Sequence, residues 1–191
     1  MNVPAHLILG TAVFGKASNA RITLAAVLGS LAPDLSLFAM AGWSLFVAGV
    51  DPAIVFGEYY FSDAWQRVFS IDNSFIFWGL GLLAAVWADH KVMVAFAAAG
   101  LMHLGFDFLL HNSDARIQFW PLSDWAFISP VSYWDVRYYA NIVSPIELGV
   151  TLILAVVLLR RFKSSLSRVF ILLAAIAEIS TSHVFGMFFS H

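Results

Sequence analysis

The residues best suited to chemistry lie in one apolar stretch, where a histidine, an aspartate and a second histidine follow at intervals of four. They are His103, Asp107 and His111. In an α-helix, each step of four residues turns the side chain by about 40°, so the three groups share one face. Two imidazoles and a carboxylate form a ligand set that suits zinc, manganese or iron. The alternative is that these groups only hydrogen-bond neighbouring helices together.

Further ionisable residues lie in the other apolar stretches. The strongest candidates are His6, Asp34 and Glu147, whereas Glu178 and His183 are more typical of packing residues. Ionisable side chains are costly inside a membrane and usually face a cavity or one another. At about 1.5 Å of rise per residue, these groups and the histidine–aspartate stripe fall at similar depths in the outer half of a bilayer. The sequence therefore predicts one shared site.

Two of the acids follow prolines, and each has two interpretations. Asp34, directly after Pro33, could cap the second half of an interrupted helix, or it could bind the metal or act as a general base. Glu147, two residues after Pro145, could be a first-turn acid or a general base. The predicted metal ligands are His6, Asp34, His103, Asp107 and His111.

The composition identifies the chain as an integral membrane protein. Of its 191 residues, 61% are hydrophobic and 12% are charged, with a mean hydropathy of +0.83. Soluble domains are about 45–50% apolar and about 25% charged. A net charge of −2 excludes the basic surface of a nucleic-acid-binding protein. Because the chain has no cysteine, disulfides, thiolate metal sites and thiol nucleophiles are excluded as well.

The apolar stretches predict an all-α, polytopic transmembrane bundle that forms a single integral membrane domain, residues 1–191. A membrane span needs about 20 helical residues. Stretches that meet or approach this length are 73–88, 92–110, 144–159 and 169–189. The stretch 22–50 is too long for one simple span, and Pro33 predicts a broken helix within it. With the short stretch 3–14, about six hydrophobic segments are expected.

The distribution of charge predicts the orientation of the bundle. Seven of the ten Lys and Arg residues fall in short connections, whereas acidic residues gather in two long ones, 51–72 and 112–141. The positive-inside rule places the short connections on the cytoplasmic side of a bacterial inner membrane and the site toward the periplasmic half. The long connections are rich in aromatic residues and are expected at the outer interface. They could instead form a lid that grips a lipid.

Four short motifs follow one another over residues 5–125. They are Pro-Ala-His at His6, Leu-Ala-Pro-Asp at Asp34, Leu-x-His-x3-Asp at His103 and Asp107, and Trp120-Pro121. In this order they resemble the YdjM-type inner-membrane family of metal-dependent hydrolases. The resemblance implies that His6, Asp34, His103 and Asp107 bind a metal. The His-x3-Asp spacing is also similar to that of zinc-dependent phospholipase C, which hints at phosphoester chemistry.

The chain departs from the family pattern between the second and third motifs. The family carries a His-Arg-Gly-x-Thr-His-Ser segment there, whereas this chain reads Ile71-Asp72-Asn73-Ser74-Phe75 and has neither histidine. An oxygen of Asp72 or Asn73, or the imidazole of His111, could substitute for the missing ligands.

Together these observations predict a membrane-bound hydrolase that uses a divalent metal, zinc first, on an ester or phosphoester of an amphiphilic or lipid-linked substrate. Asp34 or Glu147 would be the general base. The alternative is a non-enzymatic membrane protein, either a proton or ion pathway or a scaffold, in which the polar layer serves only helix packing.

Overall fold

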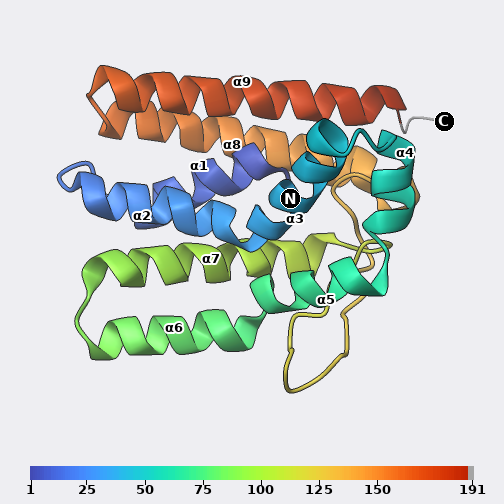
Figure 1. Cartoon of the computed structure of the whole chain (residues 1–191). Helices are drawn as coiled ribbons and strands as arrows, with labels where there is room; N and C mark the ends of the chain where they lie inside the picture. Colours follow the sequence, from blue (N-terminus) through green and yellow to red (C-terminus); the bar gives the residue numbers. More distant parts are fainter. Residues whose placement is uncertain (189–191) are drawn as a thin grey trace.

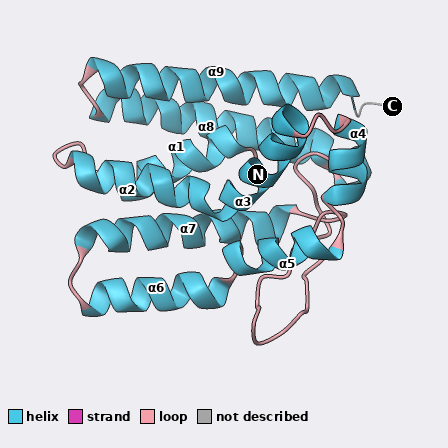
Figure 2. Cartoon of the chain, viewed as in Figure 1, coloured by secondary structure: helices cyan, strands magenta, loops and turns pink. Residues whose placement is uncertain are grey.

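A computed structural model describes the backbone of residues 1–188 and the side chains of residues 1–181, and every regular element in that part is helical (Figures 1 and 2). The long helices lie side by side in pairs that form three layers. The pairs are α8 (Ala140–Arg161) with α9 (Ser165–Phe188), α1 (Val3–Phe14) with α2 (Ala20–Leu31), and α6 (Phe75–Trp87) with α7 (Lys91–Leu110). The all-α prediction is confirmed.

Four helical stretches of the described residues are long and apolar enough to cross a membrane. They are Ala20–Val47, Asp63–Trp87, Lys91–Leu110 and Ala140–Arg161. The prediction of a membrane protein is therefore supported, but the count of about six segments is not confirmed. Helix α1 has only 12 residues, which cover about 18 Å of a hydrocarbon core that is about 30 Å thick.

The short helix α1 lies at the centre of the bundle, where it contacts α2, α7, α8 and α9. Its sequence suits this position, because apolar and small residues occur on all sides and several of them are buried, including Ala5, Ile8 and Leu9. A helix that is apolar all round is stable only when neighbours cover it. Any polar side chain on α1 is consequently held in the protein interior.

The break predicted at Pro33 divides the second apolar stretch. Helix α2 ends at Leu31, a 3-10 turn covers Ala32–Asp34, and α3 (Leu35–Gly42) continues in a different direction (Figure 1). Proline has no backbone N–H and its ring clashes with the preceding turn, so a regular helix cannot pass through it. The polar backbone groups freed at such a break need other partners.

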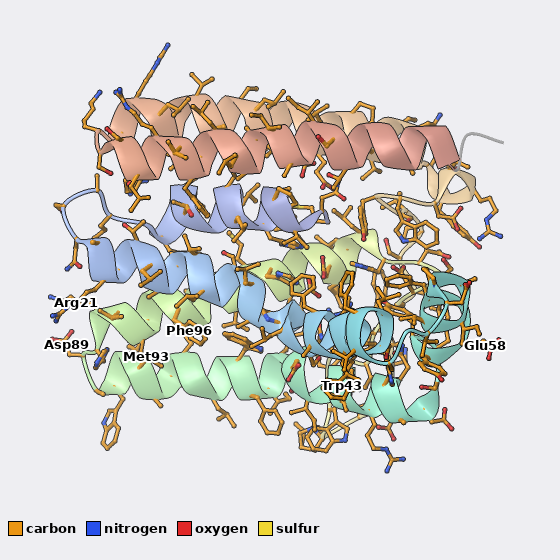
Figure 3. The ribbon with its side chains drawn as sticks, turned by 45° about the horizontal axis from the view of Figure 1, so that its top comes forward. Arg21, Trp43, Glu58, Asp89, Met93 and Phe96 are labelled. Carbon is orange, nitrogen blue, oxygen red and sulfur yellow. The ribbon has the colours of Figure 1, made fainter. Side chains whose placement is uncertain are left out.

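The two kinds of connection lie at opposite ends of the bundle. The short connections α1–α2, α6–α7 and α8–α9 are together at one end (Figure 1), where Figure 3 labels Arg21 and Asp89. Glu58 is at the other end, near α4 (Pro52–Ile54) and α5 (Asp63–Asp72). From the sequence, residues 51–72 are expected to form a loop, but they are largely helical. A turn of π-helix follows α4, and the side chain of Ser62 then caps the start of α5.

Helices α2 and α7 approach each other closely where they cross. A Cβ atom added at Gly29 would lie 2.1 Å from the carbonyl oxygen of Phe96. No real Cβ makes so short a contact with backbone, so glycine is what allows the two helices to approach this closely. Gly105, also in α7, has no atom within 4 Å of the corresponding position.

We expect Gly29→Ala to lower the free energy of unfolding by about 1–3 kcal/mol, because the two backbones must move apart. Gly105→Ala is the matched control and should be neutral or slightly stabilising, since alanine favours a helix over glycine by roughly 0.5–1 kcal/mol. Thermal unfolding in one detergent compares the two variants. Equal transition temperatures would contradict the close packing of α2 on α7.

Candidate metal centre

Two histidines from different helices meet in the interior of the bundle. The rings of His6, in α1, and His103, in α7, stack with centroids 3.6 Å apart and planes inclined by 13°. Both face the carboxylate of Asp107, one turn along α7. His6 Nε2 is 2.9 Å from Oδ1, and His103 Nε2 is 3.1 Å from Oδ2. All three side chains are buried, with at most 4% exposed.

The orientation of His103 is fixed by the helix break. Its Nδ1 lies 2.7 Å from the carbonyl oxygen of Ser30, the residue just before the end of α2. A carbonyl can only accept, so Nδ1 carries the proton and Nε2 of the neutral ring presents a lone pair. Histidines that bind metals typically donate their other ring N–H in this way. The local fold thus presents Nε2 as a ligand.

The surroundings of His103 Nε2 suit a cation. The atom is buried and makes no hydrogen bond, although it lies 3.1 Å from an oxygen of Asp107 and 3.6 Å from Oδ2 of Asp34. In the neutral ring a lone pair therefore faces two carboxylates. Positive charge between them would stabilise the arrangement.

The ligand atoms of His6, His103 and Asp107 all lie within 4.8 Å of one another, so this group could bind a metal ion. Ligands 2.0–2.2 Å from a tetrahedral zinc are about 3.4 Å apart. The separations of 2.9 and 3.1 Å to Asp107 and of 3.6 Å to Asp34 are close to that value. Small side-chain adjustments would be enough to admit a metal.

Asp34 joins the group through one oxygen and is held by the other. It does not cap α3, since its side chain makes no capping hydrogen bond. Instead Oδ1 accepts a hydrogen bond of 3.1 Å from Arg116, which leaves Oδ2 on the side of His103. The structure thus brings four of the predicted ligands together from α1, the helix break and α7.

Arg116 is the functional candidate that the sequence did not reveal. It belongs to the connection between α7 and α8, yet its side chain is buried and lies over the ring of Phe69. The same nitrogen that contacts Asp34 also donates to Oδ1 of Asn73 at 3.0 Å. Burial alone would lower the pKa of Arg116, but Tyr60 and Asp34 outweigh it and raise the pKa, so the guanidinium remains charged.

Asn73, considered as an oxygen ligand in place of a missing histidine, supports Arg116 instead. Its Oδ1 accepts from the guanidinium, and its amide donates to the carbonyls of Pro33 and Phe69. The side chain is completely buried. It therefore links the helix break to the end of α5.

His111 lies outside the group of three. Helix α7 ends at Leu110 and His111 has extended backbone, so it does not continue the helical stripe. Its Nδ1 is 2.9 Å from the backbone oxygen of Asp107 and 3.8 Å from Oδ1, while Nε2 is 3.5 Å from Asp114. Burial lowers the pKa of His111 and favours a neutral ring.

Glu147 is connected to the N-terminal residues. It lies well inside α8, which begins at Ala140, so the first-turn interpretation is wrong. Its Oε1 accepts a hydrogen bond of 2.7 Å from the backbone N–H of Asn2, whose side chain donates to Glu178. The side chain of His183 is outside the described part of the chain.

We expect purified wild-type protein to retain about one equivalent of zinc or a similar divalent metal. His103→Ala should lose it, because one ligand is removed and Asp107 keeps fewer partners. His90→Asn is the matched control, since His90 is an exposed residue that caps the start of α7 and asparagine can do the same. Elemental analysis measures all three. Equal metal in His103→Ala and wild type would contradict the assignment.

A scan against models of protein families finds no family that matches this chain. Searches of the curated proteins and of the solved structures find no match either.

Proposed function

We propose that the chain is a metal-dependent hydrolase of a bacterial inner membrane, acting on an ester or phosphoester of an amphiphilic substrate. The observation that carries the proposal is His103 Nε2, a buried ring nitrogen without a hydrogen bond that faces two carboxylates. His6, His103 and Asp107 would hold the metal, and Oδ2 of Asp34 would face it. The resemblance to the YdjM-type family, drawn from the same four residues, favours the same assignment.

The residues around the group suit hydrolysis. A divalent metal bound there would polarise the scissile ester and lower the pKa of water toward neutrality. Asp34 is the better candidate for the general base, because Arg116 holds one of its oxygens while the other faces the centre. Glu147 contacts Asn2 instead. We therefore assign proton transfer to Asp34.

Two cavities adjoin the centre. One is narrow, with no room for a water molecule, and is lined by residues that include Asp107, Arg116, Phe108 and Phe127; the two phenylalanine rings stack with centroids 4.6 Å apart. The other is apolar, measures about 340 Å³ and lies between α1, α7 and α8. Met1 lines this second cavity, and its amine contacts Asp107. The apolar cavity has room for the chain of an amphiphilic substrate, whereas the narrow cavity has to widen to admit a polar head.

A proton or ion pathway is less well supported. Such a pathway needs polar groups that continue along the membrane normal past the metal group. Toward the end with the short basic connections, the described residues instead form apolar clusters. Their members include Ile8, Leu158, Phe162, Ile22 and Ala95. The polar groups of the centre are thus closed off from that end.

The hydrolase proposal predicts that His103→Ala and Asp107→Ala each lower hydrolysis by more than about 100-fold, since a metal supplies several kcal/mol of transition-state stabilisation. The probes are p-nitrophenyl butyrate and bis(p-nitrophenyl) phosphate, tested with purified, metal-supplemented protein in detergent. His90→Asn should match the wild type. Full activity in both variants, or none in the wild type on either probe, would overturn the proposal.

The proposed orientation, with the metal centre toward the periplasm, has its own test. The chain contains no cysteine, so single cysteines report accessibility without background. We expect Asp124→Cys, at an exposed position of the long connection, to react with a membrane-impermeant maleimide in spheroplasts. Ala17→Cys, in the exposed connection between α1 and α2, should react only after permeabilisation. The reverse pattern would place the centre toward the cytoplasm.

A further inference from the structure

Arg116 is a buried cation next to the candidate metal centre, and we propose that it binds the phosphoryl group of a phosphodiester substrate. This inference rests on the metal-dependent hydrolase proposed above and narrows its substrate to one class. It assigns to Arg116 a role in recognition beyond its contact with Asp34.

The guanidinium has bonding capacity that the protein leaves unused. One terminal nitrogen donates to both Asp34 and Asn73. The Nε atom is buried and has no hydrogen-bond partner. Buried donors without partners are uncommon in proteins, and those that occur require an explanation such as a ligand that accepts from them. Arg116 therefore offers a free, charged donor in the interior.

The position of Arg116 allows one ligand to reach both the guanidinium and the metal group. Arg116 and Asp107 line the same narrow cavity, together with His111 and Gln118, and a ligand that widens this cavity meets both groups. Asp34 joins the two groups, with Oδ1 on Arg116 and Oδ2 on the side of His103. A tetrahedral phosphoryl group has several oxygens and can contact a metal and a guanidinium at once.

The charges of the site match a singly charged ligand. The two negative charges of Asp34 and Asp107 would balance the two positive charges of a divalent metal. The single positive charge of Arg116 then remains. This balance covers the proposed ligands and Arg116 alone; close by, the Met1 amine lies 2.9 Å from Asp107, and Glu147 accepts from the adjacent backbone N–H of Asn2. Unbalanced charge is costly in a buried site. A phosphodiester, with one negative charge, restores neutrality, whereas a carboxylic ester does not.

The chemistry of arginine supports the same class. Its planar fork of N–H donors matches the oxygens of a phosphate, and such charge-assisted hydrogen bonds are stronger than neutral ones. In the reaction, the oxygen of water bonds to phosphorus as the bond to the leaving alcohol oxygen breaks. One water proton passes through Asp34 to that alcohol, and the other remains on the phosphomonoester.

The test uses full-length, zinc-loaded protein in detergent, with Arg116→Gln and Arg116→Lys as variants. Arg137→Gln is the matched control, because Arg137 belongs to the same connection but has an exposed side chain. Binding of inorganic phosphate is measured by calorimetry, and kcat/KM is measured for bis(p-nitrophenyl) phosphate and for p-nitrophenyl butyrate. Zinc content is determined for every sample.

We expect Arg116→Gln to weaken phosphate binding at least about tenfold and to lower kcat/KM for the diester by about 100-fold, since charge-assisted contacts to the phosphoryl group are lost. Hydrolysis of the butyrate should fall less, by about tenfold, because Arg116 also holds the general base Asp34, and zinc should be retained. Arg116→Lys keeps the charge and should fall between Arg116→Gln and wild type. Arg137→Gln should match the wild type.

The outcomes separate this inference from the general proposal. Zinc-loaded wild type that hydrolyses butyrate but neither binds phosphate nor cleaves the diester would overturn the role of Arg116 and leave the hydrolase intact. Wild-type protein without zinc would overturn both. If Arg116→Gln does not fold, the test is made with Arg116→Lys. A lysine variant that binds phosphate and cleaves the diester as well as wild type would contradict recognition by the guanidinium.

Discussion

The buried carboxylate of Asp107 is the group on which the rest of the structure depends. A charge in the interior of an apolar bundle costs several kcal/mol unless it is closely paired. Both of its oxygens contact imidazole nitrogens, and the Met1 amine adds a further contact. The partners come from the N-terminal end of α1 and from α7 itself, so the carboxylate fixes how deeply α1 enters the bundle. The apolar surface of α1 then allows four helices to surround it.

The helix break at Pro33 has two consequences at the same place. The turn before it presents the carbonyl of Ser30 to His103 and so determines which ring nitrogen is free. The turn after it carries Asp34 to the opposite side of the same imidazole. A regular helix would have kept its carbonyls within its own hydrogen bonds. The interrupted helix thus orients His103 and positions Asp34. For this reason the candidate metal centre lies at the level of the break.

Local signals in the sequence were enough to predict the helical class, the broken helix and the convergence of four polar residues. Hydrophobic length, proline stereochemistry and i, i+4 spacing all act within one element. The differences between these predictions and the structure have causes outside a single element. Helix α7 ends just before His111, so only His103 and Asp107 share a face of the helix. The burial of Arg116 depends on how a long connection folds over α5, and the aromatic residues of 51–72 form helices once the bundle provides a surface.

The stacked rings of Phe108 and Phe127 border the narrow cavity, away from the short connections of the bundle. Parting two aromatic rings in water exposes apolar surface, which costs about 25 cal/mol per Å². The headgroup region of a bilayer accepts aromatic rings readily, so the same movement there exposes little to water. For the proposed hydrolase, the surrounding lipid would then take part in opening the cavity to a substrate. Its packing, more than any hinge in the backbone, would set how often the centre is open to a substrate that arrives within the membrane plane.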